Sequence, residues 1–201
     1  MSDRVFMIDV YSDVVCPWCY VGKRRLEQAL ASIGGAAEVT WRPFQLNPTM
    51  PKEGMERTAY LEAKFGSLEA FRRMEEHVLA AGLESRITFA FEKIPRTPNT
   101  FLAHRLIWFA AQNDRQDAVV DSLFRGYFEE GVDIGSCSAL AQLAQRAGLD
   151  AEEFLESEGG VAEVKSEEAA GHRLGIRGVP YFVLNGTYAL SGAHPPDRFV
   201  A

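Results

Sequence analysis

The feature that most limits what this chain can fold into is a pair of cysteines near its start, Cys16 and Cys19. The pair follows an apolar stretch, residues 5–11, and precedes a helical pattern over residues 20–33. A C-x-x-C sequence at the start of a helix places its first sulfur at the helix N-terminus, where free N–H groups and the macrodipole stabilise a thiolate. Two intervening residues allow the second sulfur to reach the first. The pattern predicts a strand that leads into a helix carrying a reversible dithiol–disulfide centre.

Two other roles for a cysteine pair fit this sequence less well. A zinc site needs four ligands, and the remaining candidates are one cysteine and four histidines without metal-binding spacing: Cys137, His77, His104, His172 and His194. A structural disulfide here would close a very short loop, which restricts the unfolded chain little. We therefore expect redox chemistry and no bound metal.

Composition and charge exclude several other classes of protein. The 201 residues are 47% apolar and 24% charged, as in an ordinary globular protein, and the net charge is −7. An acidic chain is a poor partner for nucleic acid or an anionic membrane surface, and no apolar run approaches the roughly 20 residues of a membrane span. Residues 1–9 lack the features of a signal peptide. We therefore expect a cytoplasmic location, where a reactive dithiol is more often catalytic than permanently oxidised.

Strand patterns lie at both ends of the chain, and helical patterns fill the middle. The expected strands are residues 4–11, 38–44, 181–184 and 187–190, the last two joined by a type I′ turn at Asn185-Gly186. The expected helices are residues 16–33 (ended by Gly34-Gly35), 56–65, 68–81, 100–112, 117–130, 140–147, a short helix capped by Asp150, and 162–174. Residues 87–91 read as a short extended piece, and Pro195 opens a last helix that Ala201 cuts short.

This order predicts an α/β architecture with a discontinuous sheet domain. A helix joins the first two strands, which favours parallel pairing, whereas the hairpin strands must be antiparallel. We expect a thioredoxin-like fold with a mixed sheet, formed by residues 1–50 and 160–201. Residues 51–159 are expected to form an inserted all-helical domain.

Several short motifs resemble one known family. They are Cys16-Pro17-Trp18-Cys19-Tyr20, Pro98-Asn99-Thr100, Ala103-His104-Arg105-Leu106, Gly148-Leu149-Asp150, Gly178-Val179-Pro180 and Ser191-Gly192-Ala193. With these motifs the chain resembles the DsbA-like branch of the thioredoxin superfamily, and within it the FrnE-type cytoplasmic members. The resemblance implies a thiol–disulfide oxidoreductase that acts on protein or small-molecule disulfides and thiols.

The resemblance also implies roles for individual residues. Cys16 would be the nucleophile and Cys19 the resolving cysteine. Pro180 would be a cis-proline facing the disulfide, and Val179 would present its backbone to a bound peptide or thiol. Pro17 belongs with them to the expected substrate-binding surface.

Two other functions remain open at this stage. The glutathione-using relatives, kappa-class transferases and 2-hydroxychromene-2-carboxylate isomerases, usually carry a single serine where Cys16 stands, and an acidic residue in the segment that matches residues 191–194. The intact pair favours disulfide exchange over glutathione-assisted isomerisation, although glutathione stays a conceivable co-substrate. The third hypothesis is a non-enzymatic interaction or chaperone module, because a fold does not fix a function. A homodimer is also left open.

Four residues outside the cysteine pair have expected positions, and each of the three cysteines has an expected property. Trp18 is expected to be an apolar contact surface for substrate, and Asn99 a helix N-cap near the site. His194 is expected at the rim of the site, and His104 to be a satisfied structural histidine. Cys16 is expected to be open to alkylation, Cys19 to be buried with a raised pKa, and Cys137 to have no functional role.

Overall fold

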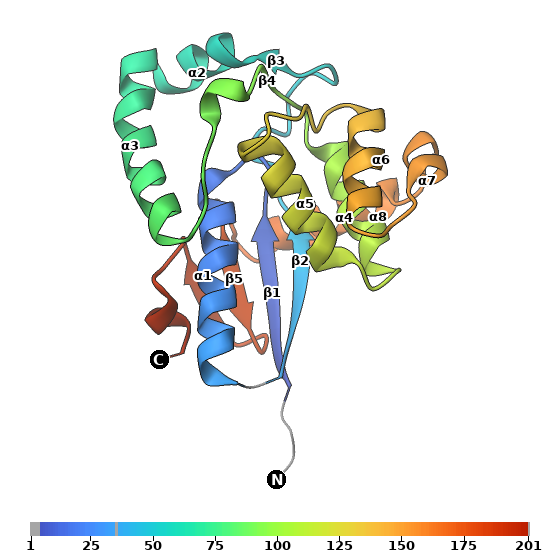
Figure 1. The fold of residues 1–201 in the computed structure, drawn as a ribbon. Helices are drawn as coiled ribbons and strands as arrows, with labels where there is room; N and C mark the ends of the chain where they lie inside the picture. Colours follow the sequence, from blue (N-terminus) through green and yellow to red (C-terminus); the bar gives the residue numbers. More distant parts are fainter. Residues whose placement is uncertain (1–4, 35, 201) are drawn as a thin grey trace.

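The computed structural model describes residues 5–34 and 36–200 and builds them around a four-stranded sheet of order β2-β1-β5-β6 (Figure 1). Strand β1 (Phe6–Ser12) pairs in parallel with β2 (Ala37–Pro43) and antiparallel with β5 (Tyr181–Leu184), and β6 (Tyr188–Ser191) forms the other edge. The expected mixed, thioredoxin-like sheet is confirmed. Of the residues expected in elements, Arg4, Gly35 and Ala201 lie outside the described part.

The hairpin between β5 and β6 has the expected type I′ turn. Asn185 has φ 51° and Gly186 has φ 65°, so both central residues are left-handed, as this turn requires. The Asn185 side chain also accepts a 3.0 Å hydrogen bond from the Met7 N–H. The turn therefore fixes the register of β5 on β1, with Ile8 opposite Leu184.

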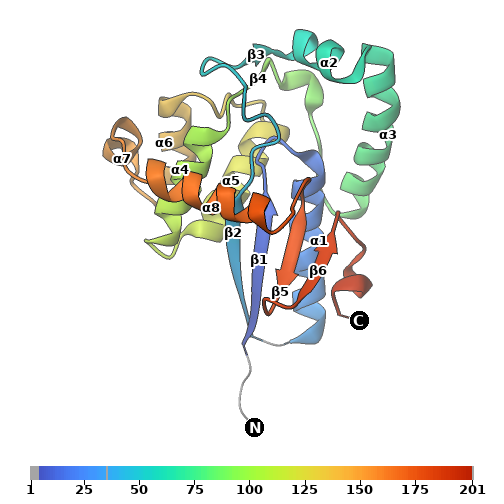
Figure 2. The same cartoon turned by 180° about the vertical axis from the view of Figure 1, so that it is seen from behind.

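Helices cover both faces of the sheet. Helix α1 (Pro17–Ile33) lies on one face with the short 3-10 helix η2 (Pro196–Phe199) beside it, and α8 (Val161–Arg173) crosses the other face (Figure 2). Proline at the first position and left-handed Gly34 (φ 61°) mark the two ends of α1. The helix that was expected to begin at Pro195 is only the single 3-10 turn η2 in the described chain.

The segment between the two halves of the sheet is mostly helical. Its elements are α2 (Arg57–Phe65), α3 (Leu68–Glu84), η1 (Phe91–Lys93), α4 (Phe101–Ala111), α5 (Gln116–Phe128), α6 (Cys137–Arg146) and α7 (Glu152–Glu156). It also contains an antiparallel pair of two-residue strands, β3 (Met55–Glu56) and β4 (Arg96–Thr97), so the expectation of an all-helical insert is wrong in this detail. The short piece expected over residues 87–91 is irregular over residues 87–90 and enters η1 at Phe91, and its Ile87 and Phe89 side chains insert into the hydrophobic core.

One hydrophobic core runs through both parts of the chain. The Tyr20 ring of α1 stacks on Phe124 and Phe128 of α5, with centroid distances of 5.1 and 6.2 Å, and it meets Phe89 edge-on. The inserted segment is therefore packed directly on the helix that carries the cysteines. The boundaries near residues 50 and 160 stay a prediction.

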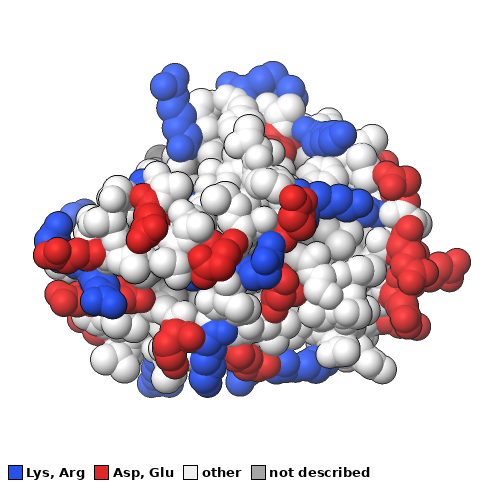
Figure 3. Space-filling model, turned by 90° about the horizontal axis from the view of Figure 1, so that it is seen from above, with Lys and Arg blue, Asp and Glu red and all other residues white. Residues whose placement is uncertain are grey.

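Two surface properties bear on the excluded classes. No helix among the described residues is long and apolar enough to cross a membrane. The face at the N-terminal end of α1 carries acidic and basic side chains intermixed, with uncharged surface between them (Figure 3). That face lacks the one-sided positive field that nucleic acid would require.

Candidate active site

Cys16 is the residue that starts helix α1. Its backbone is extended (φ −93°, ψ 111°), and its carbonyl accepts the Cys19 N–H at 3.0 Å. Only 5% of the residue is exposed, so the expectation of an open thiol is wrong. The physical reason is that the loop at Val179 covers the thiol. The Cys16 Sγ donates a hydrogen bond to the Val179 carbonyl oxygen, 3.7 Å away.

Cys19 lies one turn into the helix and is almost fully buried. Burial raises the pKa of its thiol well above the usual value, and the hydrogen bond with the Cys16 sulfur acts in the same direction. The Asp13 backbone and the Ser12 hydroxyl oppose this shift. The burial of Cys19 is as expected, its pKa is shifted in the expected direction, and its thiol lies next to the Cys16 sulfur, as disulfide exchange requires.

The Val179–Pro180 peptide bond is cis, as expected. A Cβ built on Gly22 of α1 would lie 3.1 Å from the Pro180 Cγ, so the proline ring packs on the first half of the cysteine helix. The Val179 N–H has no backbone partner among the described residues. Pro180 and Val179 are therefore beside Cys16, with one backbone donor free.

Gly22 is the contact through which the cysteine helix supports Pro180. Replacing Gly22 by alanine should cost about 1–2 kcal/mol of stability, because the new methyl group would press on both Pro180 and Phe182 at 3.1 Å. Denaturant unfolding of the reduced protein measures this cost. Gly178→Ala is the matched control, since nothing lies within 4 Å of a Cβ there. Equal losses for the two variants would contradict the contact.

A buried polar cluster beneath the cysteines was missed in the sequence. Asp13 is fully buried and accepts the Leu46 N–H at 2.7 Å through Oδ2, while its backbone carbonyl accepts the Cys16 N–H. Its Oδ1 lies 3.5 Å from Nε2 of His104, which is 2% exposed on α4. Within residues 5–34 and 36–200, neither of these two atoms has a hydrogen-bond partner. His104 is therefore buried, as expected of a structural histidine, but its Nε2 lacks a hydrogen-bond partner among the described residues, contrary to expectation.

Asn99 and His194 have mixed outcomes. The N-cap of α4 is Thr100, one residue later than expected. Asn99 Oδ1 still accepts the Phe101 N–H at 2.9 Å, and its Nδ2 donates to the Met50 carbonyl, which holds the loop before α2. The His194 ring lies 2.9 Å from the Ser191 carbonyl, and no hydrogen bond in the described part of the chain joins it to the cysteines. Its place at the rim stays a prediction, although the neighbouring Gly192 N–H donates to the Pro180 carbonyl at 2.8 Å.

Cys137 begins α6, which packs on α4, α5 and α7 and not on the cysteine helix. We expect Cys137→Ala to retain disulfide reductase activity within about twofold, because a half-buried small side chain is replaced by one of similar size. Steady-state turnover with insulin as substrate tests this. A loss above tenfold in a folded variant would mean that a third thiol takes part.

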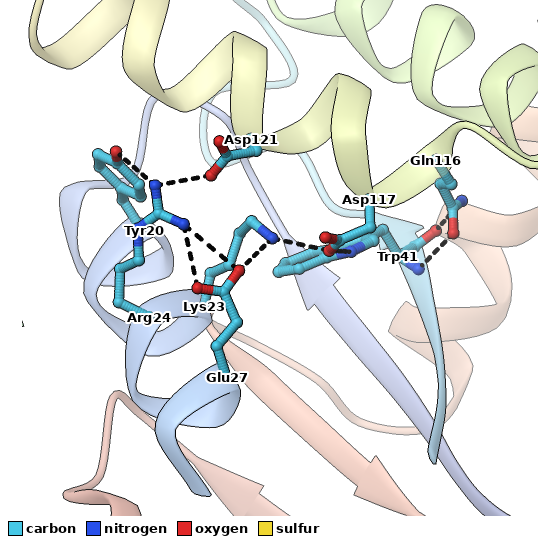
Figure 4. Close-up of polar contacts among 8 residues, drawn as sticks. All are labelled: Tyr20, Lys23, Arg24, Glu27, Trp41, Gln116, Asp117 and Asp121. Atoms are coloured by element: carbon cyan, nitrogen blue, oxygen red, sulfur yellow. Dashed lines mark hydrogen bonds and ion pairs between the residues drawn. The ribbon is translucent and has the colours of Figure 1, made fainter. Parts of the chain in front are cut away.

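A network of polar side chains attaches α1 to β2 and α5 (Figure 4). Lys23 is 1% exposed and donates to Glu27 at 2.6 Å and to Asp117 at 2.7 Å. Asp117 also accepts the Trp41 indole N–H. In the next position along α1, Arg24 forms an ion pair with Asp121, with 2.7 Å between Nη2 and Oδ1. Together with the aromatic stacking at Tyr20, these contacts hold the helix that positions both cysteines.

Fold and site together define a class: a thioredoxin-type sheet whose first helix begins with a C-x-x-C pair facing a cis-proline. The DSBA-like thioredoxin domain model matches residues 7–201, and the chain belongs to this family. No group of three or more His, Cys, Asp or Glu in the described ranges is arranged to hold a metal.

Three known proteins illustrate the range of the similarity. The uncharacterised protein YwbO of Bacillus subtilis is 30% identical over 196 residues, 96% of this chain and 92% of that protein. The crystal structure of a probable DsbA oxidoreductase of Streptomyces coelicolor is 35% identical with a TM-score of 0.87, covering 96% of this chain and 86% of the other. A 2-hydroxychromene-2-carboxylate isomerase is 17% identical with a TM-score of 0.71, covering 96% and 91%, and this likeness shows the fold alone.

Proposed function

We propose that the protein is a thiol–disulfide oxidoreductase that uses Cys16 and Cys19 as its redox pair. The Cys16 thiolate attacks a substrate disulfide and forms a mixed disulfide, and one substrate sulfur leaves as a thiolate. Cys19 then loses its proton and attacks the Cys16 sulfur, which releases the second substrate thiolate. The substrate gains two electrons, and the protein ends with a Cys16–Cys19 disulfide; the reverse sequence oxidises a dithiol.

The observation that carries this proposal is the unequal environment of the two sulfurs. Cys16 stands at the helix N-terminus, where backbone dipoles favour a thiolate. Cys19 is buried with a raised pKa, which keeps it protonated until a mixed disulfide forms at its neighbour. One nucleophile and one reserve thiol are what a two-step exchange needs.

Extended protein segments are the substrates that the surroundings of Cys16 fit best. The Val179 N–H is free to donate to a bound strand, in the manner of β-strand addition. Trp18 is 37% exposed and Pro17 is half-buried, so both offer apolar surface to flanking side chains. Small disulfides, including that of glutathione, could use the same cysteine without these contacts. We further propose that the protein works in the reducing cytoplasm, where a reductant can restore its dithiol.

A glutathione-dependent isomerase is the second candidate, because such an isomerase shares this fold. The presence of Cys19 argues against it, since isomerisation needs one glutathione-binding group and no resolving thiol. The chaperone hypothesis requires neither cysteine. The dithiol mechanism needs both cysteines and the isomerase at most Cys16, so replacing Cys16 and Cys19 in turn separates the three functions.

The experiment is to replace Cys19 by serine and to mix the reduced variant with a disulfide substrate. The proposal expects a stable mixed disulfide at Cys16, seen as a substrate-sized mass increase that dithiothreitol reverses, with multiple turnover lost. Cys137→Ser serves as the matched control and should turn over normally. Full turnover by the Cys19 variant would overturn the dithiol mechanism.

A further inference from the structure

A cavity lies between α2, α3 and η1, and neither cysteine of the pair lines it. It encloses about 310 Å³, at the lower end of the range of small-molecule sites. Its apolar wall includes Leu61, Phe71, Leu79 and the buried Phe89. The cavity is therefore large enough for one bulky side chain and little more.

Arg57 enters this cavity without a carboxylate partner. Both of its side-chain hydrogen bonds leave from Nη1 and reach neutral hydroxyls, that of Thr97 at 3.2 Å and that of Tyr127 at 3.4 Å. The guanidinium carbon also lies 5.7 Å from the Phe71 ring centroid. Across residues 5–34 and 36–200, no carboxylate lies within ion-pairing distance of Arg57. Its Nε and Nη2 donors remain for a ligand.

Glu75 supplies the opposite charge in the same cavity. The side chain is half-buried on α3, and no basic group of the described chain lies within ion-pairing distance of it. Burial raises the pKa of this carboxyl, while Arg57 and Arg72 act against the rise. The more exposed Arg72 and Glu92 also line the cavity. Each sign of charge is thus present twice, beside an apolar wall.

We propose that this cavity binds an α-amino acid in its zwitterionic form, with an aromatic or branched apolar side chain. The ligand carboxylate would accept hydrogen bonds from the planar Arg57 guanidinium, for which it is a natural partner. The ligand ammonium would donate to Glu75, and the side chain would lie against Phe71 and Phe89.

The mixture of charges is what selects a zwitterion. A simple organic anion would pair with Arg57 but would be repelled by Glu75 and Glu92. A simple amine would pair with Glu75 but would be repelled by Arg57 and Arg72. A purely apolar ligand would leave both Arg57 and Glu75 without a partner in a partly dry site, which costs free energy for each. Only a ligand with both charges on one small head group satisfies the cavity.

The site is separate from the redox chemistry. Phe89 lines the cavity and meets the Tyr20 ring of α1 edge-on at 6.0 Å between centroids, so the Phe89 ring stands between the cavity and the cysteine helix. The inference therefore does not depend on the proposed oxidoreductase function. Disulfide turnover measured on the same samples reports on the one proposal, and amino acid binding reports on the other.

The test is titration calorimetry of the full chain with L-phenylalanine, compared with phenylacetate and phenethylamine. The two analogues have the same ring but lack the ammonium and the carboxylate, respectively. We expect L-phenylalanine to bind in about the millimolar range, as suits so small a ligand, and both analogues to bind at least about tenfold more weakly. Equal affinity for all three compounds, or no binding of L-phenylalanine, would overturn the proposal.

Three variants locate the binding in the cavity. Glu75→Gln and Arg57→Met should each weaken L-phenylalanine at least about tenfold, and Leu79→Trp should abolish binding by filling a half-open wall. Arg73→Met is the matched control, because Arg73 lies on the same helix, pairs with Glu69 on the surface and does not line the cavity. If the control weakens binding as much as Glu75→Gln, or if Leu79→Trp binds normally, the site is not this cavity.

Discussion

Replacing Cys16 by serine should abolish disulfide reduction, with turnover falling by at least about a thousandfold. A serine hydroxyl is a poor nucleophile at neutral pH and forms no disulfide, so the first step of the exchange is lost. The Cys16 thiol donates a weak hydrogen bond to the Val179 carbonyl at 3.7 Å, which a hydroxyl can also donate. The fold should therefore survive the change.

Dithiothreitol-driven reduction of insulin measures this loss. Cys137→Ser is the control for removal of a thiol as such, since that residue lies on α6, which does not pack on the cysteine helix. Circular dichroism of each variant separates a chemical loss from an unfolding. Retention of more than a tenth of the activity by a folded Cys16→Ser variant would show that another group starts the reaction.

Local sequence signals predicted most of the sheet and the centre of the site. Asn185-Gly186 indicated the hairpin because few residues tolerate two left-handed positions in succession. The cysteine pair, which follows an apolar stretch and precedes a helical pattern, indicated the start of α1. Pro17 occupies the first helical position there, which suits proline. The cis bond at Pro180 came from the family resemblance, since most bonds before proline are trans and the local sequence does not decide between the isomers.

The features that sequence reasoning missed depend on contacts between distant parts of the chain. Cys16 is covered by the Val179 loop, which no property of residues near Cys16 announces. The strands β3 and β4 contain two residues each, too few for any alternation to be visible. Ile87 and Phe89 alternate as a strand would, but helices supply the apolar surface that buries them. The alternation of these two residues indicated that both are buried, but it did not show which elements bury them.

Asp13 is the clearest case of a residue whose importance appears only in three dimensions. In the sequence it is one acidic residue in an apolar run; in the fold it is fully buried and faces His104 across the junction between β1 and α4. A visible signal was available, because a lone charged residue just before a buried catalytic motif is rarely left in an apolar environment without a partner. Nothing in the sequence identifies that partner.

Replacing Asp13 by alanine should lower the stability of the protein by about 3 kcal/mol, through the loss of a buried acceptor. The Leu46 N–H would lose its 2.7 Å hydrogen bond, and the buried His104 ring would lose the carboxylate 3.5 Å away. Buried donors left without acceptors cost more than the bonds themselves contribute. For a chain of this length the melting temperature should fall by about 6–12 °C.

Two further variants decide whether the loss arises from these contacts. Asp13→Asn keeps an oxygen for the Leu46 N–H and should therefore lose clearly less stability than the alanine variant. His104→Gln, combined with Asp13→Asn in a double-mutant cycle, measures the coupling between the two buried side chains. Glu62→Ala, which removes an exposed carboxylate from α2, should be nearly neutral. A fall of less than 1 kcal/mol in Asp13→Ala would contradict the burial argument, whereas additive losses in the cycle would show that Asp13 acts through Leu46 alone. Because the Asp13 carbonyl also accepts the Cys16 N–H, a destabilised loop at this position should displace Cys16 and lower disulfide turnover.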